Sequence, residues 1–189
     1  MKKTIYLIIL QVTFTCVSVQ ANIYLSSDDN DTFIDEYFPN TISGTQPYMI
    51  VRSMNLPNFE LDTLVKFNLS TIPSGTFISS AKLNIYYYYY NDANPSGNPL
   101  NVHRITSTWS ESTANWNNRP TYSATATSTA SGPVSYGWIQ WNVRSDVQSF
   151  VNGSNTNYGW QIMDASSKNS MIYFYPKEYT DSNYRPFLE

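Results

Sequence analysis

The chain has 189 residues, of which 41% are hydrophobic, 16% aromatic and only 13% charged, and its formal net charge is −3. A negative net charge argues against nucleic acid or an anionic membrane surface as the main partner. A single cysteine and a single histidine exclude most metal-cluster and thiol chemistries and disfavour a zinc site.

The first 21 residues have the pattern of a secretory signal peptide. Two lysines are followed by an apolar run, and Val19 and Ala21 occupy the small-residue positions of an A-x-A-like cleavage site. The run has about 15 residues where a bilayer span needs roughly 20, so an uncleaved anchor is the weaker interpretation. A lipoprotein anchored at Cys16 fits less well, because the preceding residues match a lipobox poorly. We expect cleavage after Ala21, a secreted or cell-surface location, and no membrane insertion afterwards.

Residues 22–189 are predicted to form one all-β domain. Runs of alternating apolar and polar residues are separated by turns rich in Asn, Ser, Gly and Pro. The predicted strands cover residues 63–69, 81–90, 100–105, 137–143, 158–163 and 171–175. This spacing is typical of an antiparallel β-sandwich or barrel.

Two segments near the end of the chain depart from this strand pattern. Residues 143–151 are helix-like, and we expect a single turn or short helix across one end of the sandwich. Residues 185–189 begin like a strand that stops early, which indicates either a short open edge or a truncated final strand.

Several segments, taken in order, resemble one family. They include Asp31-Thr32-Phe33-Ile34, Val102-His103-Arg104-Ile105-Thr106, Trp109-Ser110-Glu111-Ser112-Thr113, Trp116-Asn117-Asn118-Arg119-Pro120, Trp141-Asn142-Val143, Asn157-Tyr158-Gly159 and Arg185-Pro186. In this order the chain is similar to the DNRLRE domain, which overlaps the disaggregatase-related repeats and carbohydrate-binding module family 96.

The resemblance implies a jelly-roll-like β-sandwich that acts outside the cell, usually as a non-catalytic module of a larger surface or polysaccharide-degrading protein. It also implies a polysaccharide ligand, since some relatives bind acidic polysaccharides such as alginate. The chain departs from the family at Asn68 and Asn142, where Asp is usual, so a charge role at those positions is not carried over.

Nothing in the sequence marks a catalytic site, and we predict that the protein is not an enzyme. A Ser-His-Asp arrangement would have to use His103, the only histidine, which lies within a predicted strand and has no nucleophile motif beside it. A pair of carboxylates acting on a glycosidic bond stays open, because acidic residues are scattered over the loops.

Acidic residues near the two chain ends are candidates for one structural calcium ion. Calcium is bound by oxygen ligands, often carboxylates on loops. The termini of a sandwich often meet, so Asp29 and Asp31 would share an ion with Glu178 and Asp181. The alternative is a solvated acidic loop that bears only on solubility.

A run of five consecutive tyrosines is the most informative local feature. Strand alternation places Leu83, Ile85, Tyr87 and Tyr89 on the core face, and it places Lys82, Asn84, Tyr86, Tyr88 and Tyr90 on the outer face. Such a stripe can stack on sugar rings, and Asn101 and His103 of the next strand would add polar groups if they shared its face. The alternatives are that a loop or second layer covers the stripe, or that it packs on a neighbouring chain.

We therefore expect a secreted, non-catalytic module that binds a polysaccharide at the cell surface or in the extracellular matrix. The resemblance allows a uronate-containing polymer, but the acidic net charge opposes one unless the cations Lys66, Lys82, Arg104 and Arg144 cluster. The alternative is a structural or adhesive subunit that self-associates through open strand edges. A polysaccharide-cleaving enzyme is the third interpretation.

Overall fold

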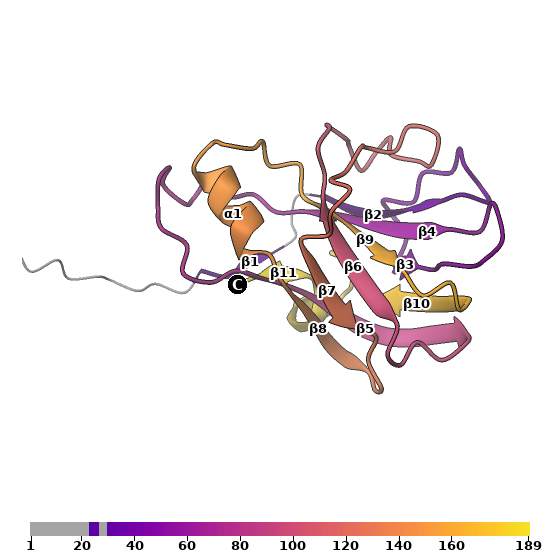
Figure 1. The fold of residues 1–189 in the computed structure, drawn as a ribbon. Coiled ribbons are helices and arrows are strands. Elements are labelled where there is room, and N and C mark those ends of the chain that lie inside the picture. The colour runs from indigo at the N-terminus through magenta and orange to yellow at the C-terminus, as the bar shows by residue number, and fades with distance from the viewer. Residues whose placement is uncertain (1–22, 27–29) are drawn as a thin grey trace, which may run out of the picture.

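Two antiparallel sheets face each other in the computed structural model, which describes residues 23–26 and 30–189 (Figure 1). The first sheet, sheet A, contains β1 (Leu25–Ser26), β11 (Phe187–Leu188), β5 (Lys82–Asp92), β10 (Ser170–Phe174), β3 (Met49–Val51) and β8 (Gly137–Asn142). The second, sheet B, has the order β2 (Asn30–Asp35), β4 (Leu61–Lys66), β9 (Trp160–Asp164), β6 (Pro99–Arg104) and β7 (Ser128–Ser131). The predicted antiparallel β-sandwich is confirmed, and the predicted signal peptide lies outside the described residues.

The core lies between the two sheets because alternate strand residues turn inward. Leu83, Ile85 and Tyr87 of β5 pack with Trp160 and Ile162 of β9 in one continuous apolar cluster. Trp141 of β8 is fully buried, and its Nε1 donates a hydrogen bond to the carbonyl of Leu100 across the sandwich, at 2.8 Å. Burial of rings of this size supplies much of the hydrophobic stabilisation in a domain that lacks disulfides.

The predicted helix is present as α1 (Arg144–Val151) and covers one end of the sandwich (Figure 1). The side chain of Asn142 accepts a hydrogen bond from the N–H of Arg144, and Asp146 lies in the first turn, where a negative charge favours the helix. Val147, Phe150 and Val151 recur at helical spacing and are buried against the core. No helix found in the described ranges is long and apolar enough to cross a membrane.

A long connection between β6 and β7, residues 105–127, covers part of the outer face of sheet B. Trp109 and Trp116 pack on a small apolar cluster that contains Ile34 and Leu64. The indole N–H of Trp109 donates to the carbonyl of Tyr158 at 2.8 Å, which joins the connection to the segment just before β9. These two tryptophans therefore serve the architecture of this end of the domain.

The sequence offered a short open edge as one interpretation of residues 185–189, but the last strand has a neighbour on each side. Leu188 of β11 pairs with Leu25 of β1 on one side and with Leu83 of β5 on the other. A 3-10 turn, η1 (Ser182–Tyr184), leads into it. Both ends of the described chain are thus joined to the same sheet.

Strand β5 contains a β-bulge that changes the predicted faces of its last tyrosines. Tyr87 pairs with Phe174 and Tyr89 pairs with Tyr173, so Tyr88 is an extra residue between two successive pairs. Alternation holds as far as Tyr87 and reverses after the bulge. Tyr90 packs against the core beside Ile172, and Tyr89 lies 45% exposed on the outer face, so the prediction was wrong for both residues.

Candidate functional site

The outer face of sheet A carries a continuous layer of aromatic side chains, which we call the aromatic face. The centroid of each ring in this layer lies within 6.3 Å of the centroid of at least one other ring of the layer. The members are Tyr86, Tyr88, Tyr89, Trp138, Tyr173, Tyr175, Tyr179, Tyr184 and Phe187. The tyrosine run thus supplies only part of a larger surface, to which β8, β10, β11 and the residues after β10 contribute.

The rings are held mainly by stacking on one another. Tyr175 stacks on Tyr88 with centroids 4.1 Å apart and planes at 4°, and it stacks on Tyr179 at 3.6 Å. Trp138 meets Tyr86 edge to face at 5.3 Å. Aromatic pairs in such geometries each stabilise by about 0.5–1.5 kcal/mol beyond their buried area. The aromatic face is therefore a pre-ordered surface, which lowers the entropy cost of binding a ligand.

A loop covers part of this surface, which was one of the alternatives raised by the sequence. Tyr179 and Tyr184, from the segment between β10 and β11, lie on Tyr175 and Tyr86. Trp138 and Tyr184 remain 38% and 37% exposed. Burial raises the pKa of Tyr88 to about 12, so its hydroxyl stays neutral at ordinary pH. The most exposed rings, Tyr89, Trp138 and Tyr184, carry no formal charge, and the two tyrosines among them each bear a hydroxyl group.

The structure gathers some of the predicted sugar-contacting residues and separates others. Lys82, Tyr86 and Tyr88 lie on the outer side of β5, with Lys82 exposed at the end of the strand. Asn101 and His103 do not join them, because β6 belongs to sheet B on the other side of the core. The chain crosses between the sheets after β5, a connection that the strand pattern alone did not reveal.

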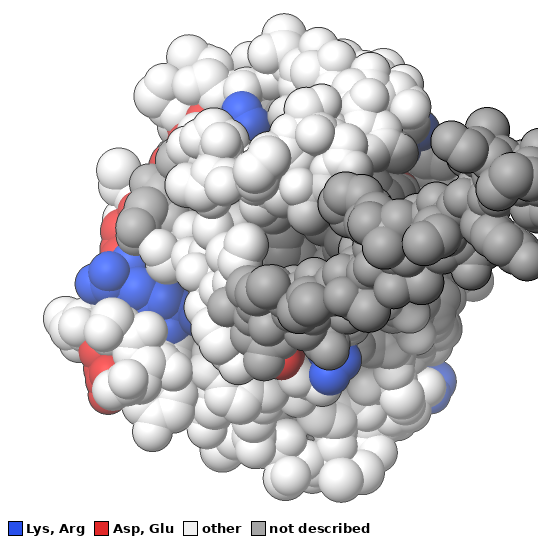
Figure 2. Space-filling view, turned by 90° about the vertical axis from the view of Figure 1, so that its left-hand side faces the viewer, with Lys and Arg blue, Asp and Glu red and all other residues white. Residues whose placement is uncertain are grey.

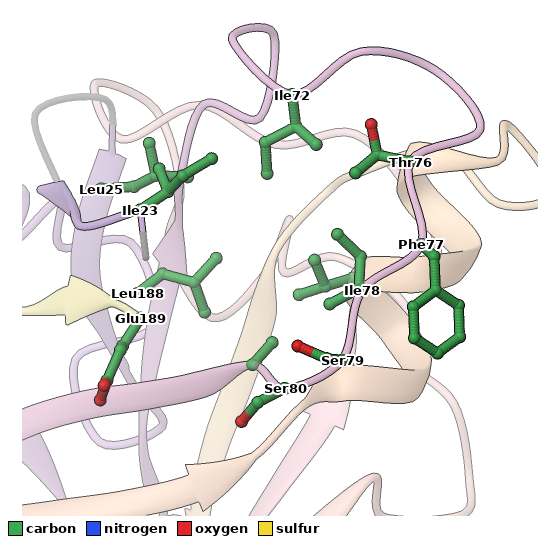
Figure 3. Close-up of a pocket in the computed structure, with 12 residues that line it drawn as sticks. Ile23, Leu25, Ile72, Thr76, Phe77, Ile78, Ser79, Ser80, Leu188 and Glu189 are labelled. Atoms are coloured by element: carbon green, nitrogen blue, oxygen red, sulfur yellow. The ribbon is translucent and has the colours of Figure 1, made fainter. Parts of the chain in front are cut away.

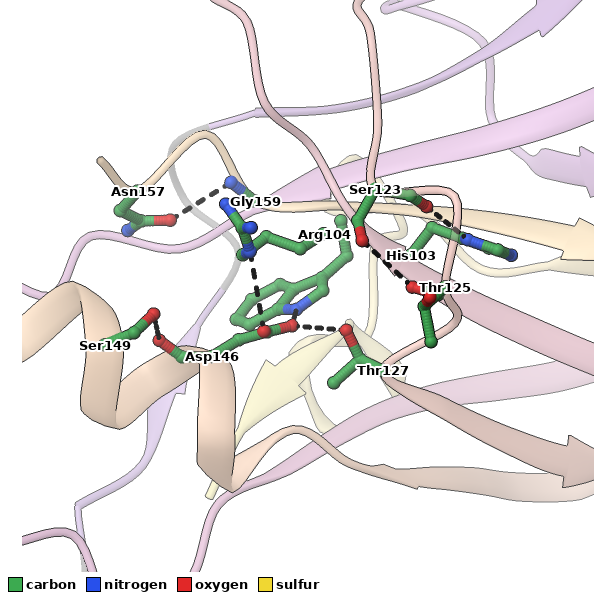
Figure 4. Close-up of polar contacts among 10 residues, drawn as sticks. His103, Arg104, Ser123, Thr125, Thr127, Asp146, Ser149, Asn157 and Gly159 are labelled. Carbon is green, nitrogen blue, oxygen red and sulfur yellow. Dashed lines mark hydrogen bonds and ion pairs between the residues drawn. The ribbon is translucent and has the colours of Figure 1, made fainter. Parts of the chain in front are cut away.

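His103 is buried in sheet B and bonded to the backbone. Its Nδ1 lies 2.8 Å from the carbonyl oxygen of Ser123 (Figure 4). Asp146 of α1 lies nearby and accepts hydrogen bonds from Thr127 at 2.6 Å and from the indole of Trp160 at 2.9 Å, with Arg104 at 3.7 Å. These contacts join α1 to sheet B and account for Arg104, a cation that the sequence had offered for a uronate.

Three carboxylates from distant segments meet at one point. Asp31 of β2, Glu111 of the 105–127 connection and Glu178 after β10 each place an oxygen within 4.8 Å of the others. The ammonium of Lys177 donates to Glu111 and Glu178, and the backbone N–H of Lys177 donates to Asp31 at 2.7 Å. This acidic cluster could hold a metal ion, since three hard oxygen ligands converge there.

Asp31 is the most unusual member of the acidic cluster. It is 1% exposed, and its Oδ1 has no hydrogen-bond partner within the described part of the chain. Burial raises the pKa of Asp31 to about 8, although the hydrogen bond from the N–H of Lys177 acts the other way. Hydrogen bonds to Glu111 and Glu178 raise the pKa of Lys177, against the lowering effect of its burial.

The acidic cluster overlaps only in part with the predicted calcium ligands. Asp31 and Glu178 are present, whereas Asp29 lies outside the described residues. Asp181 turns elsewhere, because its side chain accepts hydrogen bonds from the backbone and side chain of Asn183. Sequence reasoning missed Glu111, whose one signal was its place in the Trp-Ser-Glu-Ser motif.

A pocket lies beside α1, between the connection that follows β4 and the two ends of the described chain near β1 and β11 (Figure 3). Ile72, Ile78 and Leu188 line it with aliphatic groups, and the ring of Phe77 is 75% exposed to solvent. Phe77 is the one aromatic residue among the described residues that line it, so the pocket lacks the continuous layer of rings found on sheet A.

A second cleft opens beside β3, and it combines rings with polar groups. Tyr37, Tyr48 and Phe59 line it together with Arg52 and Asp35. Tyr48 also contacts Tyr173 of the aromatic face, with ring centroids 5.6 Å apart. The cleft and the aromatic face are therefore neighbours.

Comparison with known proteins identifies the family of the chain. The model of a family described as carbohydrate-binding module family 96 matches residues 22–188. A search of curated proteins found no match.

Proposed function

We propose that this chain, which belongs to carbohydrate-binding module family 96, binds a polysaccharide on the aromatic face of sheet A. The observation that carries the proposal is the layer of stacked rings on that sheet. Sugar rings present flat C–H faces that pack on aromatic rings, and tyrosine hydroxyls at the rim of the surface can bond the sugar hydroxyls. Trp138, Tyr89 and Tyr184 are the members most open to a ligand.

Binding of this kind needs no catalytic group, and we propose that the protein is not an enzyme. The surroundings of His103 support this, because Nδ1 is engaged by a backbone carbonyl and the side chain is only 8% exposed. Asp146 is likewise committed to structural hydrogen bonds. Neither group is presented to the aromatic face, where the polysaccharide would lie.

We further propose that the protein acts outside the cell, secreted or at the cell surface. The signal-peptide pattern in residues 1–21 and the carbohydrate-binding family both support this location. The absence of cysteine after Ala21 means that its stability in that setting depends on the core.

The acidic cluster is the place where we propose that one structural calcium ion binds. The residues fit the ion, because the buried Oδ1 of Asp31 has no partner among the residues that the structure describes and the other two ligands are carboxylates. The ammonium of Lys177 holds the same carboxylates and would have to leave for the ion to enter. A bound ion would join β2, the 105–127 connection and the segment after β10.

The proposed function is tested by affinity electrophoresis of residues 22–189 through gels that contain neutral polysaccharides or polyuronates, each with calcium or with chelator. We expect retardation in at least one gel. Retardation in none of them would overturn the binding proposal. If chelator left both the mobility and the melting temperature unchanged, the calcium proposal would fail and the binding proposal would stand.

A self-associating structural subunit remains the alternative function. The observation that favours it is that β8 pairs only with β5 among the described strands and so forms an edge of sheet A, although β7 lies close to it. Light scattering after gel filtration distinguishes the two functions. Oligomers that persist in excess free glycan would support the structural role, and a monomer would count against it.

A further inference from the structure

The cleft beside β3 has the composition of a sugar subsite, and nothing in the proposed function uses it. We call it the β3 cleft and define it by Asp35, Tyr37, Gln46, Tyr48, Arg52 and Phe59. These residues come from the end of β2, the two connections that flank β3, and the isolated bridge that follows β3. Side chains from residues 35–59 thus converge on one hollow.

Aromatic rings form the walls of the β3 cleft. Tyr37 stacks on Phe59 with centroids 5.4 Å apart and planes at 25°, and Tyr37 is 55% exposed. Tyr48 lies between Phe33, at 5.7 Å, and Tyr173, at 5.6 Å. Because Tyr173 belongs to the aromatic face, ring contacts join that face to the Tyr48 wall of the cleft, while Tyr37 and Phe59 form a separate pair.

Hydrogen-bonding groups of both kinds complete the β3 cleft. Arg52 is fixed by its Nε, which donates to the carbonyl of Phe59 at 2.9 Å, and its guanidinium lies 5.4 Å from the Phe59 ring centre. Its two terminal nitrogens remain donors, since no ion pair involves Arg52 in the described ranges. Asp35 uses Oδ1 to accept from the N–H groups of Tyr37 and Phe38, which leaves Oδ2 as an acceptor.

A donor and an acceptor beside aromatic walls suit neighbouring hydroxyls of a sugar ring, because each hydroxyl both donates and accepts. A sugar carboxylate suits the cleft less well. Asp35 offsets the attraction that Arg52 would exert on a carboxylate. The acidic Glu36 lies beside Glu60, whose backbone N–H donates to the Glu36 carboxylate.

The other cations do not form a row that could follow a polyuronate. Arg104 faces Asp146 in sheet B, and Lys177 is held by Glu111 and Glu178. Arg144 bonds the carbonyl of Ile78 at the α1 end. On the end of the molecule seen in Figure 2, the basic residues lie in separate patches rather than in a line. Arg104, Arg144 and Lys177 are therefore engaged by groups of the protein itself.

We propose that the β3 cleft binds one neutral hexopyranose unit of a polysaccharide whose adjoining units lie on the aromatic face. The sugar stacks on Tyr37, donates a hydroxyl hydrogen to Asp35 and accepts from Arg52. This inference rests on the proposed function and assigns its ligand to the neutral polysaccharides.

The test is calorimetric titration with neutral hexasaccharides of glucose, mannose and xylose and with acidic hexasaccharides of uronic acids. The informative variant is Tyr37→Ala, and Tyr136→Ala is the matched control, because Tyr136 is 59% exposed and does not line the β3 cleft. We expect at least one neutral hexasaccharide of a hexose to bind, with affinity reduced about tenfold by Tyr37→Ala and changed less than about twofold by Tyr136→Ala.

The outcomes separate this inference from the proposed function. Equal affinity for Tyr37→Ala and the unmodified protein would overturn the β3 cleft as a subsite and leave binding to the aromatic face intact. Preference for an acidic hexasaccharide would overturn the neutral class alone. Binding of no saccharide, together with no retardation in any polysaccharide gel, would overturn the proposed function itself.

Discussion

Tyr88 and Tyr175 lie face to face, with ring centroids 4.1 Å apart and planes at 4° to each other. Tyr88 lies on the outer face, as alternation predicts, and it is the extra residue of the β5 bulge between Tyr87 and Tyr89, which pair with β10. The N–H of Tyr175 donates to the carbonyl of Tyr86 at 3.1 Å, which fixes the backbone beneath the ring. The order of the aromatic face is therefore set by the backbone as well as by ring packing.

Tyr175 is the central ring of this arrangement, so its removal should be costly. Tyr175→Ala removes the stacks on Tyr88 and Tyr179, and we expect the free energy of unfolding to fall by about 2 kcal/mol. Tyr136→Ala, which loses a single edge contact with Tyr87, should cost less than about 1 kcal/mol. Urea denaturation of both variants measures the difference, and equal losses would show that stacking does not hold the aromatic face.

Much of the fold follows from local sequence, and the exceptions have identifiable causes. Alternation located β5, β6 and β10 to within about two residues, because half-buried strands need that period. The bulge at Tyr88 was invisible, since five identical residues carry no signal of where an extra one sits. The separation of β5 from β6 into different sheets was also hidden, because strand order depends on packing of the whole domain.

The candidate sites were predictable only in part for the same reason. Tyr86 and Tyr88 were found from alternation, but Trp138, Tyr175 and Tyr179 joined them through pairing between distant strands. Lys177 reaches Glu111 across a sequence separation of 66 residues, and no local pattern marks such a contact. The β3 cleft likewise forms from the end of β2, the two connections that flank β3 and an isolated bridge, none of which carries a distinctive local pattern.

Trp138 offers a direct test of glycan binding to the aromatic face. Its ring is 38% exposed and contacts Tyr86 and Phe187, so Trp138→Ala removes stacking surface without opening the core. We expect affinity for the retarding polysaccharide to fall about tenfold or more. Phe77→Ala is the control, because Phe77 is exposed beside α1. Affinity electrophoresis measures both, and an unchanged mobility of Trp138→Ala would place the ligand elsewhere.

Lys177 and a calcium ion should compete for the acidic cluster. Lys177→Met leaves Glu111 and Glu178 without their cation, so in chelator its melting temperature should fall below that of the unmodified protein. Calcium should then raise the melting temperature of Lys177→Met more than that of the unmodified protein, because no ammonium has to be displaced. Lys168→Met serves as the control, because Lys168 is exposed and lies in the connection between β9 and β10, outside the acidic cluster. If calcium shifted neither protein, the cluster would not be a calcium site.

The buried carboxyl of Asp62 should make stability depend on pH. Burial raises the pKa of Asp62 to about 7, although the hydrogen bond from Gln161 acts the other way. The unfolded chain releases this proton near pH 4. Between roughly pH 4 and pH 7 the folded state therefore holds more protons, and the unfolding free energy should decrease as the pH rises through this range.

Asp62→Asn stays neutral at every pH, so its unfolding free energy should fall less between pH 5 and pH 8 than that of the unmodified protein, as measured by urea denaturation. An identical decrease in both proteins would contradict the assignment, and Asp31, whose pKa is raised in the same direction, would then be its main source.

Gly159 should be the glycine that tolerates substitution least, and its neighbours explain why. It has φ of +80°, and an added Cβ would lie 2.1 Å from the carbonyl oxygen of Val65 in β4. Gly159→Ala therefore meets both backbone strain and a clash with backbone that cannot move without shifting sheet B. We expect a loss of more than about 3 kcal/mol in the free energy of unfolding.

Gly153 has φ of +72° with nothing within 4 Å, so Gly153→Ala carries the strain without the clash and should cost about 1 kcal/mol. Thermal and urea denaturation of the two variants compare these costs directly. Equal losses would mean that the close approach of β4 to Gly159 contributes nothing. A much larger loss for Gly159→Ala would explain the Asn-Tyr-Gly motif as a requirement of strand packing rather than of ligand binding.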